Sequence, residues 1–297
     1  MRVATYNIHG AVGLDRQRRP DRIAEVLLSL DADIIGLQEV EGRRSRSRVD
    51  QARVIGEALG YNLIAGPLLI EGGGGYGNVL LSRYPVLRAE RRVYQRPGSQ
   101  TRGLLDTIVA HPRFGRLRVI VTHLEVRDHR IRATQLRELE ELLANDPDEP
   151  AILMGDLNEW WSRRDALRSL DRTVRFLHSP ATFPARLPIL RLDRIAVRAL
   201  RSTDHDGFAR RVDNALTRIA SDHLPLIADL EPLEALPAPR PEDRTPDRDQ
   251  VSVSSSLHST PIARQAASSS AKAASIAGTS SPRKTMLVPG LSIRKKG

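Results

Sequence analysis

The chain has 297 residues, a net charge of +10, 40% hydrophobic residues and no cysteine. This length can bury a full core, and the charge suits an anionic partner such as nucleic acid, a phospholipid headgroup or another phosphate ester. The lack of cysteine excludes disulfides, thiolate metal sites and cysteine nucleophiles. Because no segment approaches the roughly 20 apolar residues that span a bilayer, and the N-terminus lacks an apolar signal core, we expect a soluble, cytoplasmic protein.

Short apolar segments alternate with helical patterns over residues 1–232. Helical spacing predicts helices at 20–30, 49–60 and 129–145, the first with Pro20 in its first turn and the second closed by Gly60. Apolar runs predict strands at 2–8, 32–40, 61–66, 77–82, 103–110, 116–124, 151–155, 191–197 and 224–230. So many strands with three helices favour an α+β fold of two packed sheets flanked by helices, rather than one doubly wound sheet.

The composition changes after residue 232. All four lysines lie beyond this point, at Lys272, Lys284, Lys295 and Lys296, in a segment rich in Pro, Ser and Ala. Few large apolar groups are present there to offset the entropy of ordering, so we predict a domain at 1–232 and a disordered basic tail at 233–297. Ten basic less five acidic residues give the tail +5, which leaves +5 for the domain. The basic end offers a peripheral contact to anionic surfaces, although a solvated end is the simpler interpretation.

Several predicted strands end on polar side chains, as "AILMGDLNEW" does at residues 151–160. Each such residue alone is typical of a turn former, a surface carboxylate or a satisfied structural histidine. Together they form a set of acids, amides and imidazoles: Asn7, Glu39, His123, Asp156, Asn158, Asp193, Asp222 and His223. The set indicates a site at one edge of the sheets.

Three of these residues suit a hard cation. Mg²⁺ prefers oxygen ligands and keeps several waters, so one or two carboxylates and an amide are enough to hold it against a phosphate. Glu39, Asn7 and Asp222 meet that requirement, and the lack of cysteine argues against structural zinc. Magnesium, or manganese in its place, is the expected cofactor.

The remaining members match the needs of phosphate ester hydrolysis. A water must be oriented and deprotonated, and donors must surround the charge that builds on the phosphoryl oxygens. Asp156 is the candidate proton acceptor, and Asn158 the candidate group that holds the water or the phosphate. His123 and His223, if protonated, are candidate donors to the phosphoryl oxygens.

A serine hydrolase is a competing interpretation, because Ser221, Asp222 and His223 are the three residue types of a catalytic triad. Neighbouring residues of an extended segment point to opposite faces, so three consecutive residues cannot form the chain of nucleophile, base and orienting acid. A G-x-S-x-G elbow is also missing from the sequence. This interpretation is therefore disfavoured.

The motifs "TYNIHG", "LQEV", "YGNVLLSRYP", "TRGLL", "THLEV", "GDLNEW", "LDRIAV" and "SDHLPL" follow one another from residue 4 to about residue 230. In this order they resemble the endonuclease/exonuclease/phosphatase superfamily, the metal-dependent phosphoesterases related to pancreatic deoxyribonuclease. The resemblance implies a four-layer α/β/β/α sandwich of two mainly antiparallel sheets, with the site at one edge. It also implies that residues 1–232 form the catalytic domain.

The resemblance further implies individual roles. Asn7 and Glu39 look like the metal side, and Asp156 with Asn158 look like the pair that activates water. His223 looks like the group that contacts the scissile phosphate, with Asp193 orienting it and His123 as a second donor. Asn78 and Arg102 also occupy family positions near the phosphate. Trp160 and Trp161 follow Asp156 and Asn158 in the sequence and are candidates for the wall of the substrate channel, although an aromatic after a turn more often serves packing.

The substrate is less well specified. "VEGRR" after Glu39 and "NIHG" after Tyr6 differ from the usual motifs of abasic-site repair endonucleases, while "TFPARLPILRLDRI" is similar to the phosphodiesterase-like domain of lipid-anchor (GPI) remodelling proteins. The sequence thus favours a Mg²⁺-dependent phosphodiesterase acting on a lipid or inositol headgroup. The alternatives are a nuclease without sequence preference and a non-catalytic module that binds anions. The oligomeric state is left open.

Overall fold

The computed structural model describes residues 1–47, 49–94, 100–160, 167–204, 207–233 and 253–256. Within these ranges the strands form two seven-stranded sheets. The first sheet has the order β11-β13-β1-β2-β4-β3, with β12 paired to β13. Its strands are β1 (Arg2–Asn7), β2 (Ile34–Glu41), β3 (Asn62–Glu71), β4 (Gly74–Ser82), β11 (Leu200–Ser202), β12 (Arg210–Arg211) and β13 (Leu226–Pro232).

The second sheet has the order β14-β5-β6-β7-β8-β10-β9. Its strands are β5 (Val86–Tyr94), β6 (Arg102–His111), β7 (Gly115–His123), β8 (Ala151–Asp156), β9 (Arg175–Phe176), β10 (Asp193–Arg198) and β14 (Val253–Ser256). Most neighbouring strands of both sheets run antiparallel, and the pairs β1–β2, β7–β8 and β5–β14 run parallel. The predicted pair of mainly antiparallel sheets is confirmed.

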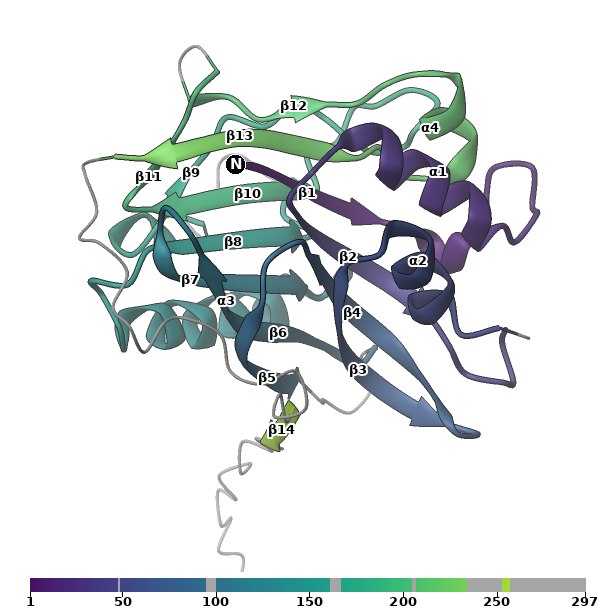
Figure 1. Cartoon of the computed structure of the whole chain (residues 1–297), viewed down its shortest axis with the longest axis horizontal. Coiled ribbons are helices and arrows are strands. Elements are labelled where there is room, and N and C mark those ends of the chain that lie inside the picture. The colour runs from purple at the N-terminus through teal and green to yellow at the C-terminus, as the bar shows by residue number, and fades with distance from the viewer. Residues whose placement is uncertain (48, 95–99, 161–166, 205–206, 234–252, 257–297) are drawn as a thin grey trace, which may run out of the picture. The chain divides into compact units, whose positions relative to one another are not determined.

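Helices cover the outer face of each sheet (Figure 1). The helices are α1 (Pro20–Leu30), α2 (Gln51–Leu59), α3 (His129–Ala144) and α4 (Ala215–Ala220), with single 3-10 turns at η1 (His9–Ala11) and η2 (Leu170–Arg172). Residues of α1, α2 and α4 pack on the first sheet, and residues of α3 pack on the second. A third apolar cluster fills the space between the sheets, with Leu80 and Leu226 from one and Val121 and Met154 from the other. These three cores give the predicted four layers.

Local sequence signals fix the helix ends. Pro20 opens α1, where its missing N–H costs no hydrogen bond, and Asp31 closes the helix in the left-handed conformation. The side chain of Asp50 accepts a hydrogen bond from the Arg53 N–H at the start of α2, and Asp128 caps α3 in the same way. In the described part of the chain, no helix combines the length and apolar character needed to cross a membrane.

The structure adds elements that the apolar patterns did not predict. Strand β5 contains four charged residues in "VLRAERRVY", which interrupt the apolar run, yet it pairs along β6. Helix α4 is only one and a half turns long and is held by a capping box between Asn214 and Thr217. Four residues of the segment predicted as a disordered tail are described, as strand β14 beside β5. The rest of that segment beyond Leu233 lies outside the described residues.

Strand register brings the predicted polar residues to one end of the sheets. His123 ends β7 directly opposite Asp156, which ends β8, and Asp193 begins β10 opposite Asp156 on its other side. In the first sheet, Asn7 ends β1 beside Gln38, and the register of β2 shifts between Leu37 and Val40. Figure 1 shows the arrowheads of β1, β7 and β8 pointing to the same end of the molecule, where β10 begins.

Gly155 is required where β7 and β8 approach each other before this end. Its φ is 149°, and a Cβ at this position would lie 1.9 Å from the carbonyl oxygen of Thr122. Because that oxygen belongs to the backbone, a side chain at residue 155 must displace the ends of both strands. Gly155 thus allows a close approach of the two strands within the sheet.

We therefore expect Gly155→Ala to lower the free energy of unfolding by about 2–4 kcal/mol, from backbone strain together with overpacking. Gly60→Ala is the matched control: Gly60 has φ 68° with nothing within 4 Å of its added Cβ, so only the conformational cost of about 1 kcal/mol applies. Thermal unfolding of both variants measures the difference. Equal losses would show that the close approach to Thr122 is unimportant.

Candidate active site

One amide joins the polar ends of the two sheets. The Nδ2 of Asn7 lies 3.3 Å from Oε1 of Glu39 in its own sheet and 3.1 Å from Oδ2 of Asp156 in the other. The backbone N–H of His9 donates to Oδ1 of Asn7 at 3.1 Å, which fixes the orientation of the amide. The hydroxyl of Ser221 donates to the Asn7 carbonyl at 2.8 Å and holds the segment before β13 against β1.

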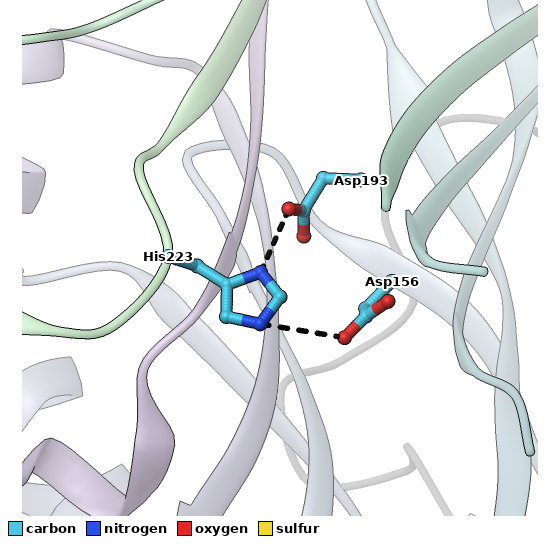
Figure 2. Close-up of side chains that lie close together, drawn as sticks. All are labelled: Asp156, Asp193 and His223. Carbon is cyan, nitrogen blue, oxygen red and sulfur yellow. Dashed lines mark hydrogen bonds and ion pairs between the residues drawn. The ribbon is translucent and has the colours of Figure 1, made fainter. Parts of the chain in front are cut away.

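His223 lies between two carboxylates (Figure 2). Its Nδ1 donates to Oδ2 of Asp193 at 2.9 Å, and its Nε2 lies 3.7 Å from Oδ2 of Asp156. The Thr182 hydroxyl donates a short hydrogen bond to the same Asp193 oxygen, and the Phe183 ring lies 4.9 Å from the imidazole. Asp193 is fully buried, so this acid is positioned to orient His223 rather than to meet a substrate.

The charges of this group are set by burial and by each other. Burial alone lowers the pKa of His223, but the charge and hydrogen bond of Asp193, followed by the charges of Asp156 and Asp222, raise it to about 10. Burial raises the pKa of Asp156 to about 6, against the opposing effect of the His223 charge. At pH 7 His223 is therefore a cation. Asp156 beside it is a carboxylate whose pKa lies just below that pH.

His123 differs from this pattern. Burial, then the positive charges of Arg102 and His223, lower its pKa well below 6.5, so it is neutral at pH 7. Nη1 of Arg102 lies 3.5 Å from Nδ1 of His123, which places the proton of the neutral ring on Nε2, 3.4 Å from Oδ2 of Asp156. His123 is thus positioned to donate one N–H as a neutral imidazole, so the condition of protonation attached to both histidines is met by His223 alone.

Asn158 and Arg102 lie beside these groups. The backbone N–H of Asn158 donates to Oδ1 of Asp156 at 3.0 Å, and its side-chain Nδ2 donates to the Leu124 carbonyl at 3.0 Å. Asn158 has a φ of 51°, in the left-handed region of backbone conformation. Arg102, which is 4% exposed, donates to the Gln100 side chain at 2.6 Å and faces His123.

The accessible acids of the site offer oxygen donors. Glu39 has a φ of 59° at the register shift of β2, and its side chain is 22% exposed. The Asp222 side chain is 30% exposed, and its Oδ1 lies 3.7 Å from Nδ1 of His9. These carboxylates are less buried than the other acids of the site, and carboxylate and amide oxygens are the ligand types that a hard divalent cation prefers. Among the described residues, two acids and a histidine lie close enough together to share one cation. They are Asp156, Asp193 and His223, and one ligand atom from each lies within 4.8 Å of the others.

Asn78 has a different environment from the other predicted residues. It is 1% exposed, and its Nδ2 donates to the carbonyls of Gly103 at 2.9 Å and Val121 at 3.4 Å. These bonds link β4 to the second sheet, and among the described residues no hydrogen bond joins Asn78 to the site group. Of the two predicted channel residues, Trp160 is 40% exposed, and Trp161 lies outside the described residues.

Some residues of the site were not predicted from the sequence. Thr182 and Phe183 precede β10 by about ten residues, and no periodicity distinguishes them, although "TFP" stands close to the "LD" motif. Tyr76, in β4, is electrostatically linked to both Glu39 and Arg102: burial, then Glu39, raises the pKa of its phenol, and Arg102 lowers it. Its place at the start of "YGNVLLS" is the one sequence signal that could have found it.

The geometry excludes the triad of consecutive residues. The Ser221 hydroxyl donates to the Asn7 carbonyl, while the backbone N–H of His223 lies 3.3 Å from that hydroxyl. The imidazole nitrogens of His223 face Asp193 and Asp156 instead. Ser221 is therefore a structural residue of the turn that positions His223.

Comparison with known proteins identifies the family of the chain. Residues 4–223 match the model of the Endonuclease/Exonuclease/phosphatase family. The uncharacterized protein YbhP of Escherichia coli K12 is 30% identical over 246 residues, which cover 77% of this chain and 95% of YbhP.

Two solved structures are similar in fold. The endonuclease/exonuclease/phosphatase of Beutenbergia cavernae superposes with a TM-score of 0.63 and 25% identity over 79% of this chain and 72% of that protein. A mannosyl-6-phosphatase of Bacteroides thetaiotaomicron has a TM-score of 0.60 and 18% identity over 78% of this chain and 99% of that protein. On the sequence match and the shared fold, the chain belongs to the Endonuclease/Exonuclease/phosphatase family.

Proposed function

We propose that the protein is a Mg²⁺-dependent phosphodiesterase that activates water at Asp156. The observation that carries the proposal is the arrangement around this carboxylate. Asn7 and the Asn158 backbone donate to its two oxygens, and cationic His223 lies 3.7 Å away. A fixed proton acceptor beside a fixed cationic donor is what hydrolysis of an anionic ester requires.

In this mechanism, water attacks phosphorus while the Asp156 carboxylate takes one of its protons. A new P–O bond forms to the water oxygen, the P–O bond to the leaving alcohol breaks, and the departing oxygen takes a proton from solvent. His223, oriented by Asp193, donates to a phosphoryl oxygen as negative charge builds there. His123 donates its Nε2 proton to a phosphoryl oxygen. Arg102, which faces Nδ1 of His123, keeps the proton of the neutral ring on Nε2.

We assign the metal cofactor to the two partly exposed acids of the site, Glu39 and Asp222. Glu39 and Asp222, with Asn7 beside them, would hold Mg²⁺ or Mn²⁺, which would supply neutralising charge to the substrate phosphate. We expect Glu39→Gln to weaken Mg²⁺ binding by about tenfold or more, because a carboxylate ligand is lost. Calorimetric titration of the substrate-free protein measures this directly. Glu57→Gln, which changes an exposed acid paired to Arg53 on α2, is the control and should bind as the wild type does.

The physiological ester belongs to a lipid or inositol headgroup or to nucleic acid. The net charge of +10 supports any of these, and the mannosyl-6-phosphatase of the same fold acts on a sugar phosphate. A panel in Mg²⁺ should compare plasmid nicking with release of headgroups from phospholipid vesicles and with inositol phosphate hydrolysis. Faster headgroup turnover supports the first class, and unselective nicking supports the second. No turnover across the panel, with anion binding that needs no metal, would leave a non-catalytic binding module.

A further inference from the structure

A separate hollow of about 610 Å³ is lined by residues that follow two of the site residues in the sequence. Its walls include Glu159 and Trp160, which follow Asn158 in the chain, and Arg194, which follows Asp193. Successive residues of a strand point to opposite faces, so Asp193 turns to His223 while Arg194 turns to the hollow. Nη2 of Arg194 lies 3.4 Å from the Glu159 carbonyl and ties the two walls together.

Among the described residues that line the hollow, arginines outnumber acids. Arg168, Arg191 and Arg194 line it together with the acids Glu159 and Asp171. The Glu159 carboxylate is bound by Nε of Arg132 at 3.0 Å, in a pair where both side chains are buried. The Asp193 carboxylate, next to Arg194 in sequence, is bound by His223 and Thr182. The two acids next to Arg194, Glu159 and Asp193, therefore each have another hydrogen-bond partner.

Burial and a neighbouring like charge destabilise the charged form of Arg194. Burial, followed by the like charge of Arg191, lowers its pKa to about 10 in spite of Asp193 and Glu159. In the described part of the chain, its guanidinium makes one hydrogen bond to protein, to the Glu159 carbonyl. An anion between Arg191 and Arg194 would relieve this repulsion and would accept charge-assisted hydrogen bonds from both.

The rim also offers an aromatic surface. Trp160 is 40% exposed, and the Arg132 guanidinium lies 5.4 Å from its ring centroid, which holds the ring in place. Trp160 lines the hollow and lies two residues after Asn158 in the sequence. A ring carried by the substrate can pack on it while one phosphate reacts at Asp156 and another occupies the hollow.

We propose that this hollow is a subsite for a second phosphate group of the substrate, bound by Arg191 and Arg194, one organic unit away from the phosphate that is hydrolysed. The proposal rests on the phosphodiesterase function proposed above. It names a shared chemistry, because a neighbouring phosphate occurs both in a nucleotide chain and in a polyphosphorylated headgroup.

The test uses two chromogenic diesters that differ by one phosphate: thymidine 5′-(4-nitrophenyl phosphate) and the same compound with a 3′-phosphate. The wild type should hydrolyse the 3′-phosphorylated diester with a kcat/KM higher by about tenfold or more, as expected for a charge-assisted pair. Arg191→Gln and Arg194→Gln should each reduce this preference and leave kcat on the diester without the 3′-phosphate unchanged.

Arg186→Gln is the matched control, because Arg186 is an exposed arginine of the same segment that does not line the hollow. It removes the same charge from the same region and should keep the preference. Equal loss of preference in all three variants would assign the effect to the long-range field and overturn the subsite. A wild type without preference, or a preference unchanged in both Arg191→Gln and Arg194→Gln, would also overturn it. No turnover of either diester would instead contradict the proposed function.

Competition distinguishes the two sources of the second phosphate. Thymidine 3′,5′-bisphosphate and myo-inositol 1,4-bisphosphate are each added to the assay of the diester that lacks the 3′-phosphate. Inhibition that weakens in Arg191→Gln and Arg194→Gln supports the subsite, and the stronger inhibitor identifies the source. Inhibition by both compounds that is equal in wild type and variants contradicts it.

Discussion

Asp156→Asn should lower kcat for an aryl phosphodiester by about 10²–10⁴-fold, the range found when a general base is removed. Asparagine keeps the size and can still accept a hydrogen bond from Asn7, but it cannot take the proton of water. The expected loss is in kcat, because the groups that bind the phosphate stay in place. Rates of 4-nitrophenol release at saturating substrate measure it.

The change also alters a buried charge, so it needs a buried control. Asp106 in β6 is fully buried and pairs with Arg118 at 2.7 Å, in the same sheet but away from the site group. Asp106→Asn should lower the melting temperature, because Arg118 loses its buried partner, while kcat stays close to that of the wild type. If Asp156→Asn retained its turnover, or if Asp106→Asn lost as much as Asp156→Asn does, Asp156 would not be the base.

Asp193→Asn should move the alkaline limb of the pH–rate profile toward neutrality. The active form holds a proton on His223 and none on Asp156, so the rate should rise as pH passes about 6 and fall as pH passes about 10. The negative charge of Asp193 is what raises the pKa of His223 against burial. Without it, burial lowers that pKa, and the proton is lost at lower pH.

Rates between pH 5 and 11 for the wild type and Asp193→Asn measure this shift, and NMR titration of the His223 ring gives an independent value. At neutral pH the variant should lose about 10²-fold or more in kcat, as when a donor to a developing oxyanion is removed. An alkaline limb that stays in place would mean that another group titrates there and that Asp193 does not control His223.

The fold followed from local patterns where those patterns are strong. The helical spacing from Pro20 to Leu30 and from His129 to Ala144 was read from the sequence to within a residue. Strands with continuous apolar runs, such as β7 and β8, were predicted because both of their faces are covered. Strand β5 was missed because its stability comes from pairing with β6, which single-strand composition does not encode.

The convergence of the site was predictable for a related reason. Asn7, His123 and Asp156 each end an apolar strand, and strand ends of stacked sheets meet at one edge. The bridging role of Asn78 between the sheets was not predictable, because it depends on the spacing of β4 from the second sheet. The protonation of His123 likewise depends on three-dimensional burial and on the neighbouring Arg102. The arginine-lined hollow arises from segments about thirty residues apart, so no motif marks it.

The most direct test of the account is reversible dependence of hydrolysis on a divalent cation. The dialysed wild type is assayed on an aryl phosphodiester in Mg²⁺, after addition of chelator, and after Mg²⁺ is restored in excess. We expect turnover in Mg²⁺, loss with chelator and recovery on restoration, with the melting curve showing a folded protein throughout. Turnover that persists in chelator, or a folded protein that never turns over in Mg²⁺ or Mn²⁺, would contradict the assignment of this site to metal-dependent ester hydrolysis.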